Sequence, residues 1–133
     1  MFKQSIEYTD FNGNQRNEEF YFHLSLPEVT RMEAKFGRPI PEHAAELGKT
    51  MDEPALLEFL EHVILTSYGK KTSDGRSFQK SAELRSEFEN SQAYAELFEM
   101  MITNNEVAQR FGEQVAETGK TKKNTVEPVV LSE

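Results

Sequence analysis

Three histidines and a large number of glutamates are the residues of this chain whose side chains could bind a metal or move a proton. His62 lies four residues after Glu58, a spacing at which two side chains share one face of a helix and can hold a metal ion together. A metal site needs a third ligand, and both His23 and His43 are distant in the sequence. Glutamates on helices are mostly solvated, because acid–base catalysis needs a cleft that shifts the pKa of the carboxyl group. The sequence therefore predicts no catalytic residues, no metal, no cofactor and no enzymatic activity.

Length and composition indicate a single soluble domain that binds neither nucleic acid nor membranes. The 133 residues suffice for one hydrophobic core, and the absence of cysteine excludes disulfides, thiolate zinc sites and thiol nucleophiles. A formal net charge of -8 opposes binding to a phosphate backbone, which requires clustered lysine and arginine. No apolar run approaches the roughly 20 residues that a membrane helix needs. The acidic surplus either keeps the domain soluble or forms a surface for a basic partner.

Alternating apolar residues predict that a β-hairpin over residues 2–26 opens the chain. Most of the apolar residues in both halves fall on even-numbered positions, which is the period of a strand with one buried face. Between the halves, Asp10 and Gly13 suit a type I turn that is closed by a glycine bulge, which pairs Asp10 with Asn14. The predicted register sets Phe2 opposite Phe22, Gln4 opposite Phe20 and Ile6 opposite Glu18. Because a lone hairpin is marginal in water, it must lie on the protein's own helices or join the sheet of another chain in a homo-oligomer.

Helical periodicity predicts a helical body over residues 27–117. The first helix is expected over residues 27–36, with a stop at Gly37. Only a short helical turn is expected over residues 42–47, because two prolines interrupt the pattern just before it. The predicted fold class is therefore α+β, with an N-terminal β-hairpin followed by a mostly α-helical domain.

The longest helical signal begins at a capping box formed by Thr50 and Glu53 and ends at Gly69. Its wide apolar face makes this helix the centre of the predicted core. A loop with a reverse turn at residues 73–76 then completes a helix-loop-helix. The expected N-terminal caps of the later helices are Ser81, Ser91 and a capping box of Thr103 with Glu106. Residues 118–133 lack periodicity and are expected to form a flexible, disordered tail.

Two ordered sets of residues resemble a known family. The first set is Tyr8-Thr9-Asp10-Phe11-Asn12-Gly13 with Glu19-Phe20-Tyr21-Phe22-His23-Leu24. The second set is Ser67-Tyr68-Gly69-Lys70-Lys71, Ser73-Asp74-Gly75-Arg76-Ser77-Phe78-Gln79-Lys80-Ser81, Phe88, Ala93-Tyr94 and Glu96-Leu97-Phe98. In this order they are similar to the tail assembly chaperones of long-tailed bacteriophages of the Gram-positive type, over about residues 2–115.

The resemblance implies a non-enzymatic assembly factor that acts in the host cell cytoplasm and is absent from the mature virion. It implies that the protein binds the tape measure protein, keeps it soluble, and helps to recruit tail tube subunits. Such chaperones often exist in two lengths through a programmed frameshift, and the longer form contacts the tail tube protein. Lys122-Lys123-Asn124 could be encoded by a slippery run of bases, in which case this chain is the shorter, unshifted product.

A chaperone for a long amphipathic helix needs apolar grooves between its own helices and a charged rim around them. Five side chains in the second half of the chain are candidates for such a partner-binding groove. They are Tyr68, Phe78, Tyr94, Phe98 and Met101. The alternative is that all five belong to the core.

Two further functions are compatible with the sequence. Residues 81–117 hold eight glutamates and two arginines, which would also suit an acidic DNA mimic that inhibits a host protein. The protein could instead be a structural tail component that stays in the particle. Many copies of the protein in purified virions would favour the structural component over the chaperone.

Overall fold

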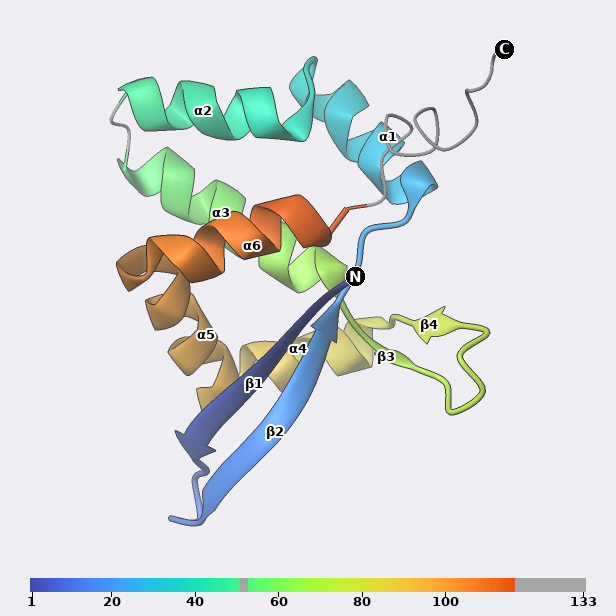
Figure 1. Cartoon of the computed structure of the whole chain (residues 1–133), viewed down its shortest axis with the longest axis vertical. Coiled ribbons are helices and arrows are strands. Elements are labelled where there is room, and N and C mark those ends of the chain that lie inside the picture. Colours follow the sequence, from blue (N-terminus) through green and yellow to red (C-terminus); the bar gives the residue numbers. More distant parts are fainter. Residues whose placement is uncertain (51–52, 117–133) are drawn as a thin grey trace.

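Ten elements make up the part of the protein that a computed structural model describes, which is residues 1–50 and 53–116. In chain order they are β1 (Phe2–Thr9), β2 (Gln15–Phe22), α1 (Leu26–Phe36), α2 (Ile40–Thr50), α3 (Glu53–Ser67), β3 (Tyr68–Lys71), β4 (Phe78–Gln79), α4 (Ala82–Glu89), α5 (Gln92–Thr103) and α6 (Asn105–Gln114). The hairpin projects from one end of the molecule, and α1 and α2 lie at the opposite end (Figure 1). This arrangement confirms the predicted α+β class. The tail expected over residues 118–133 lies outside the described residues.

The hairpin of β1 and β2 has the predicted register. Phe2 pairs with Phe22, Gln4 with Phe20 and Ile6 with Glu18. The amide of Asp10 donates to the carbonyl oxygen of Asn14 over 2.9 Å, and Gly13 closes the turn with a φ of 84°, a conformation that favours glycine. Phe2 and Ile6 are fully buried, and β1 packs on α5 and α6. The hairpin thus lies on the protein's own helices.

The sheet contains four antiparallel strands in the order β1-β2-β3-β4, where the sequence predicted two. The stop expected at Gly69 is wrong, because α3 ends at Ser67 and the chain turns directly into β3. Tyr68 and Gly69 pair with the last two residues of β2, and the predicted turn at residues 73–76 connects β3 to β4. An open strand edge offers hydrogen bonds from a partner distant in the sequence, which local periodicity cannot reveal. The expected helix-loop-helix is therefore a helix, a short β-hairpin and a helix.

The helix α1 has the predicted ends, and α2 is longer than predicted. A capping box between Ser25 and Glu28 starts α1, and Gly37 ends it with a left-handed φ of 77°. The short turn expected over residues 42–47 is instead the helix Ile40–Thr50. A proline in the first turn of a helix loses no intrahelical hydrogen bond, so the prolines at this point do not shorten α2.

The caps of the later helices agree with the sequence at two positions and differ at a third. Ser81 and Ser91 cap α4 and α5 as predicted. The capping box expected at Thr103 is wrong, because Thr103 is the last residue of α5 and its hydroxyl donates to a carbonyl of its own helix. Asn104 caps α6 instead, and its side-chain oxygen accepts from two amides of the first turn. The other expected box, at Thr50, involves a side chain outside the described residues.

One hydrophobic core joins the sheet to the helices. Most of its buried side chains come from the first hairpin, from β3 and from α1, α3, α4, α5 and α6. An ion pair at the edge of this core connects distant parts of the chain. Lys80 Nζ lies 2.8 Å from both carboxylate oxygens of Glu28, and it donates to the carbonyl oxygen of His23 over 2.6 Å. The segment before α4 is thereby tied to the start of α1.

Candidate partner-binding groove

A groove of about 500 Å³ opens between β2, β3 and the end of α4. Its floor is aromatic, since the ring of Tyr68 stacks on Phe88 with centroids 4.3 Å apart and Phe20 lies 5.4 Å from Phe88. β3 brings Tyr68 to this place but pairs with β2 only at Tyr21 and Phe22. The space beside the rest of β2 stays open and forms the groove.

Charged side chains surround the aromatic floor. Glu18 and Glu19 come from β2, and Glu87 comes from α4. Lys70 and Lys71 come from β3. The groove therefore offers apolar surface to the side chains of a partner and ionic groups of both signs around it. Such a combination suits the binding of a peptide segment.

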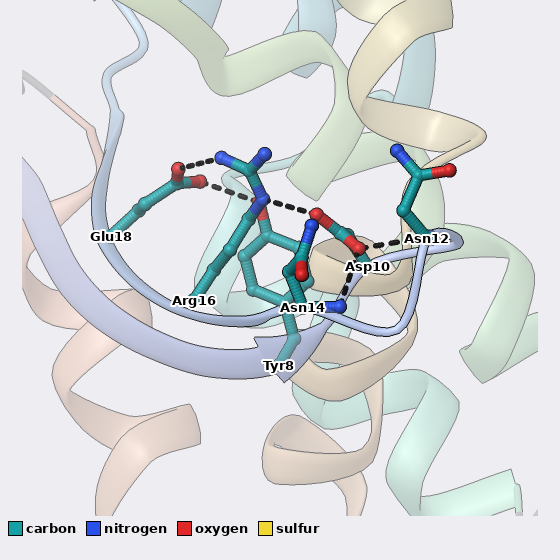
Figure 2. A network of polar contacts seen from close by, with 6 residues as sticks. All are labelled: Tyr8, Asp10, Asn12, Asn14, Arg16 and Glu18. Carbon is teal, nitrogen blue, oxygen red and sulfur yellow. Dashed lines mark hydrogen bonds and ion pairs between the residues drawn. The ribbon is translucent and has the colours of Figure 1, made fainter.

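A network of polar contacts holds the wall of the groove that the first hairpin supplies (Figure 2). The hydroxyl of Tyr8 donates to Glu18 over 2.5 Å. Arg16 donates to Glu18 over 3.1 Å and to Asp10 over 2.6 Å. Asp10 also accepts from two amides of the turn, each over 2.9 Å. The turn and the strand thus form one unit that keeps Glu18 beside the groove.

These contacts shift pKa values in directions that preserve the network. The hydrogen bond from Arg16, together with those from the turn amides, lowers the pKa of Asp10. Burial and the hydrogen bond to Glu18 raise the pKa of Tyr8 to about 12. Near neutral pH, Asp10 is therefore an anion and Tyr8 is a neutral donor.

An aromatic row continues from the groove along α5. Tyr94 lies 5.5 Å from Phe88, and Phe98 lies 6.3 Å from Tyr94. The hydroxyl of Tyr94 donates to Glu61 of α3 over 2.9 Å. Burial and this hydrogen bond raise the pKa of Tyr94. Tyr94 and Phe98 are both partly exposed, so the row offers apolar surface next to the groove.

The structure brings three of the five predicted contact residues together and separates the other two. Tyr68 lines the groove, and Tyr94 and Phe98 follow it in the aromatic row. Phe78 lies on β4, outside the lining of the groove, and Met101 lies in the core. Tyr68 is 7% exposed and Met101 is 5% exposed, so both have a role in the core. Contact with a partner stays a prediction for all five residues.

Sequence analysis missed Tyr8, Phe20 and Phe88 as residues of the groove. The predicted register could have indicated Tyr8 and Phe20, because even-numbered residues of the hairpin share one face. Tyr8 and Phe20 indeed lie side by side, with ring centroids 6.4 Å apart. The place of Phe88 depends on how α4 packs on the sheet, and no pattern within α4 shows this.

No group of three metal-ligating side chains occurs in residues 1–50 and 53–116. In that same part of the chain, no helix has the length and apolar character needed to cross a membrane. The aromatic groove combines apolar rings with charged side chains of both signs.

The fold and the groove define a small α+β protein with a surface suited to a peptide segment of a partner. A family model described as phage tail assembly chaperone matches residues 1–116 of the chain. The chain therefore belongs to the phage tail assembly chaperone family. No curated protein and no solved structure matches it.

Membership of this family confirms the resemblance found in the sequence. The general role of the protein is that of a chaperone in the assembly of phage tails. Such chaperones are typically non-enzymatic, which agrees with the expectation drawn from the residue types. Their general partners are proteins of the tail.

Proposed function

We propose that the protein binds the tape measure protein in the host cell cytoplasm and keeps it soluble while the tail assembles. The observation that carries this proposal is the aromatic groove beside β2 in a chain of the tail assembly chaperone family. The resemblance implies a long helical client with exposed apolar surface. Such a client needs cover until tail tube subunits surround it, because exposed apolar surface promotes aggregation.

The size of the groove suits repeated weak contacts. A volume of about 500 Å³ accommodates a few side chains of a client, not a folded domain. Many copies of the chaperone along one client would together bind it firmly. In this proposal the partly exposed rings of Phe78, Tyr94 and Phe98 extend the contact surface. Tyr68 belongs to the groove floor, and the buried Met101 takes part only through the core.

The proposal includes the finer points that the resemblance implies. Residues 1–117 act as one chaperone domain, and a longer frameshifted form recruits the tail tube protein. A slippery heptamer is expected in the gene at the codons for Lys122-Lys123-Asn124. Sequencing that shows no such heptamer would remove the frameshift from the proposal.

Co-expression with the neighbouring tape measure gene tests the main proposal. The wild-type chain is expected to raise the soluble fraction of the tape measure protein and to co-purify with it. Phe20→Ala removes part of the groove floor. This change is expected to weaken binding about tenfold, because truncation of an aromatic contact costs about 1–2 kcal/mol of binding free energy.

Phe11→Ala is the matched control for this experiment. Phe11 lies in the hairpin turn with 77% of its surface exposed, and it does not line the groove. Its truncation is expected to leave co-purification unchanged. Circular dichroism checks that both variants fold. An unchanged solubility of the client with the wild type, or equal behaviour of the two variants, would contradict the proposal.

A further inference from the structure

A second groove, of about 440 Å³, lies between α1, α2 and α3, at the end of the molecule opposite the hairpin (Figure 1). Phe36 of α1 and Phe59 of α3 belong to its lining, with ring centroids 5.3 Å apart. Both side chains are only partly buried. The two grooves have no lining residue in common, so this one is a separate feature.

The helix α2 covers this apolar surface incompletely. Its half-buried apolar and aromatic side chains recur at i, i+3, i+4 and i+7, the spacing of an amphipathic helix. They are Ile40, His43, Ala44 and Leu47. Among the described side chains of α2 none is fully buried, whereas each of the other described helices buries at least one. Of the described side chains of α2, Ile40 packs against the core from its edge, and none belongs to the buried cluster itself.

One imidazole makes the ring contacts between α2 and the two phenylalanines. His43 stacks on Phe36 with centroids 4.3 Å apart and meets Phe59 edge-on at 4.9 Å. Arg38 donates to the Nδ1 atom of His43 over 3.1 Å. A leucine or phenylalanine in the place of this ring would bury more apolar area. A helix with larger apolar residues at these positions would therefore bind the same surface better than α2 does.

We propose that the surface formed by α1 and α3 is a second binding site, for an amphipathic helix of the client, and that α2 occupies it as a displaceable substitute in the free protein. The identity of the client rests on the function proposed above. Until the client arrives, α2 limits the exposure of Phe36 and Phe59 and so protects the free chaperone from aggregation. A client helix gains its advantage by burying more apolar area at the same spacing.

The lining of this groove carries one charge of each sign, Lys35 and Glu58. Burial, followed by the charges of Lys35 and Arg85, lowers the pKa of His62. Lys35 also lies in the lining of the groove, where a carboxylate of a client helix can pair with it, and Glu58 in the same lining can pair with a basic residue. α2 itself carries Glu42 and Glu46 beside its apolar stripe. We expect the client helix to carry acidic residues at comparable positions.

A disulfide that locks α2 in place tests the proposal, in a chain that has no other cysteine. Leu47→Cys on α2 and Ala55→Cys on α3 both lie in the lining of the groove. Mass spectrometry reports whether the bond has formed, and the same protein after reduction is the control. The reduced form is expected to bind the tape measure protein at least about tenfold more tightly, because the oxidised form cannot release α2. Equal binding by the two forms would overturn the proposal.

A second measurement does not need the client. Ala44→Pro breaks α2 and uncovers the surface of α1 and α3. A fluorescent peptide of residues 38–50 with the natural sequence is expected to bind this variant and not the oxidised double-cysteine protein, as measured by fluorescence anisotropy. Failure of the folded variant to bind the peptide would show that α1 and α3 form no helix-binding surface.

Two further outcomes would each contradict part of the proposal. If Ala44→Pro unfolds the whole chain, α2 belongs to the folded framework, and the inference is wrong. If the peptide binds while neither cysteine form binds the tape measure protein, the assignment of the client fails and the helix-binding surface stands. The two proposals can therefore fail separately.

Discussion

At the scale of single residues, Gly69 affects both the packing of the sheet and the shape of the groove. A Cβ atom at this position would lie 2.6 Å from the carbonyl oxygen of Gln79 and 2.7 Å from Cε2 of Phe78. Any other residue would therefore push β4 away from β3. Since β3 also places Tyr68 in the groove floor, a change at Gly69 reaches the site as well.

Gly69→Ala is expected to destabilise the protein by about 2 kcal/mol, because the added carbon forces the backbone of β4 to shift away from β3. Gly112→Ala is the matched control. Gly112 lies inside α6, and a Cβ atom there would meet no atom within 4 Å. This change is expected to stabilise the protein by about 0.5–1 kcal/mol through helix propensity. Urea unfolding measures both, and equal stability of the two variants would contradict the packing argument.

The ion pair of Glu28 and Lys80 predicts how stability depends on pH. Burial raises the pKa of Glu28, but the hydrogen bonds from Lys80 and from a backbone amide outweigh it and hold the pKa below its usual 4.5. The folded protein therefore binds fewer protons than the unfolded chain, so stability rises with pH in this range. The contribution is present above about pH 4.5 and is lost as the pH falls through the lowered value.

Lys80→Met is expected to cost about 1–2 kcal/mol near neutral pH, because it leaves the half-buried carboxylate of Glu28 without its partner. The loss of stability below about pH 5 should become shallower in this variant. Thermal unfolding between about pH 3 and pH 7 measures both effects. Lys3→Met is the control, since the ion pair of Lys3 is exposed and is expected to contribute less than about 0.5 kcal/mol.

At the scale of elements, the junction of α5 and α6 depends on one side chain. Asn104 lies between the two helices, its amide donates to the carbonyl oxygen of Met100, and its side chain caps α6. Both helices pack on β1, so the junction supports the hairpin that forms one wall of the groove. A capping residue thus affects the site without touching it.

Asn104→Ala is expected to destabilise the protein by about 1 kcal/mol, the usual cost of a lost N-cap. Thr103→Ala should change stability by no more than about 0.5 kcal/mol, because its hydroxyl only bonds within its own helix. Chemical denaturation of the two variants compares neighbouring positions directly. A greater loss of stability in Thr103→Ala than in Asn104→Ala would favour Thr103 as the N-cap, as the sequence pattern predicted.

At the scale of the whole molecule, residues 1–50 and 53–116 include two separate apolar grooves. One groove lies beside the first hairpin, and the other lies between α1, α2 and α3. Acidic side chains are frequent over the surface, and the net charge of -8 keeps such a chain soluble despite these grooves. Two apolar grooves on a strongly charged body suit the repeated weak binding of a long client that we propose.

The chaperone role predicts that the protein leaves the tail before the virion is complete. Mass spectrometry of purified particles is expected to show no stoichiometric amount of it. The lysate of infected cells, analysed in the same way, provides the positive control. Detection at many copies per virion would instead identify a structural tail component.

The sequence by itself determined the first hairpin, both ends of α1, the starts of α4 and α5, and the family. The hairpin register followed from alternation and a turn whose residues lie within a few positions of one another, and capping residues such as Ser81 and Ser91 act within one helical turn. Local patterns of this kind are readable because the interacting groups are close in the sequence.

Only the tertiary structure decided the second half of the sheet, the two grooves and the placement of the predicted contact residues. Tyr68 was expected in the long helix but is the first residue of β3. The edge of β2, which is distant in the sequence, pairs with Tyr68 and supplies backbone hydrogen bonds there. Phe88 lies in the groove floor because of the way α4 packs, and the side chain of Met101 lies in the core. The sides on which aromatic residues lie depend on contacts between distant segments, and no periodicity along one segment contains that information.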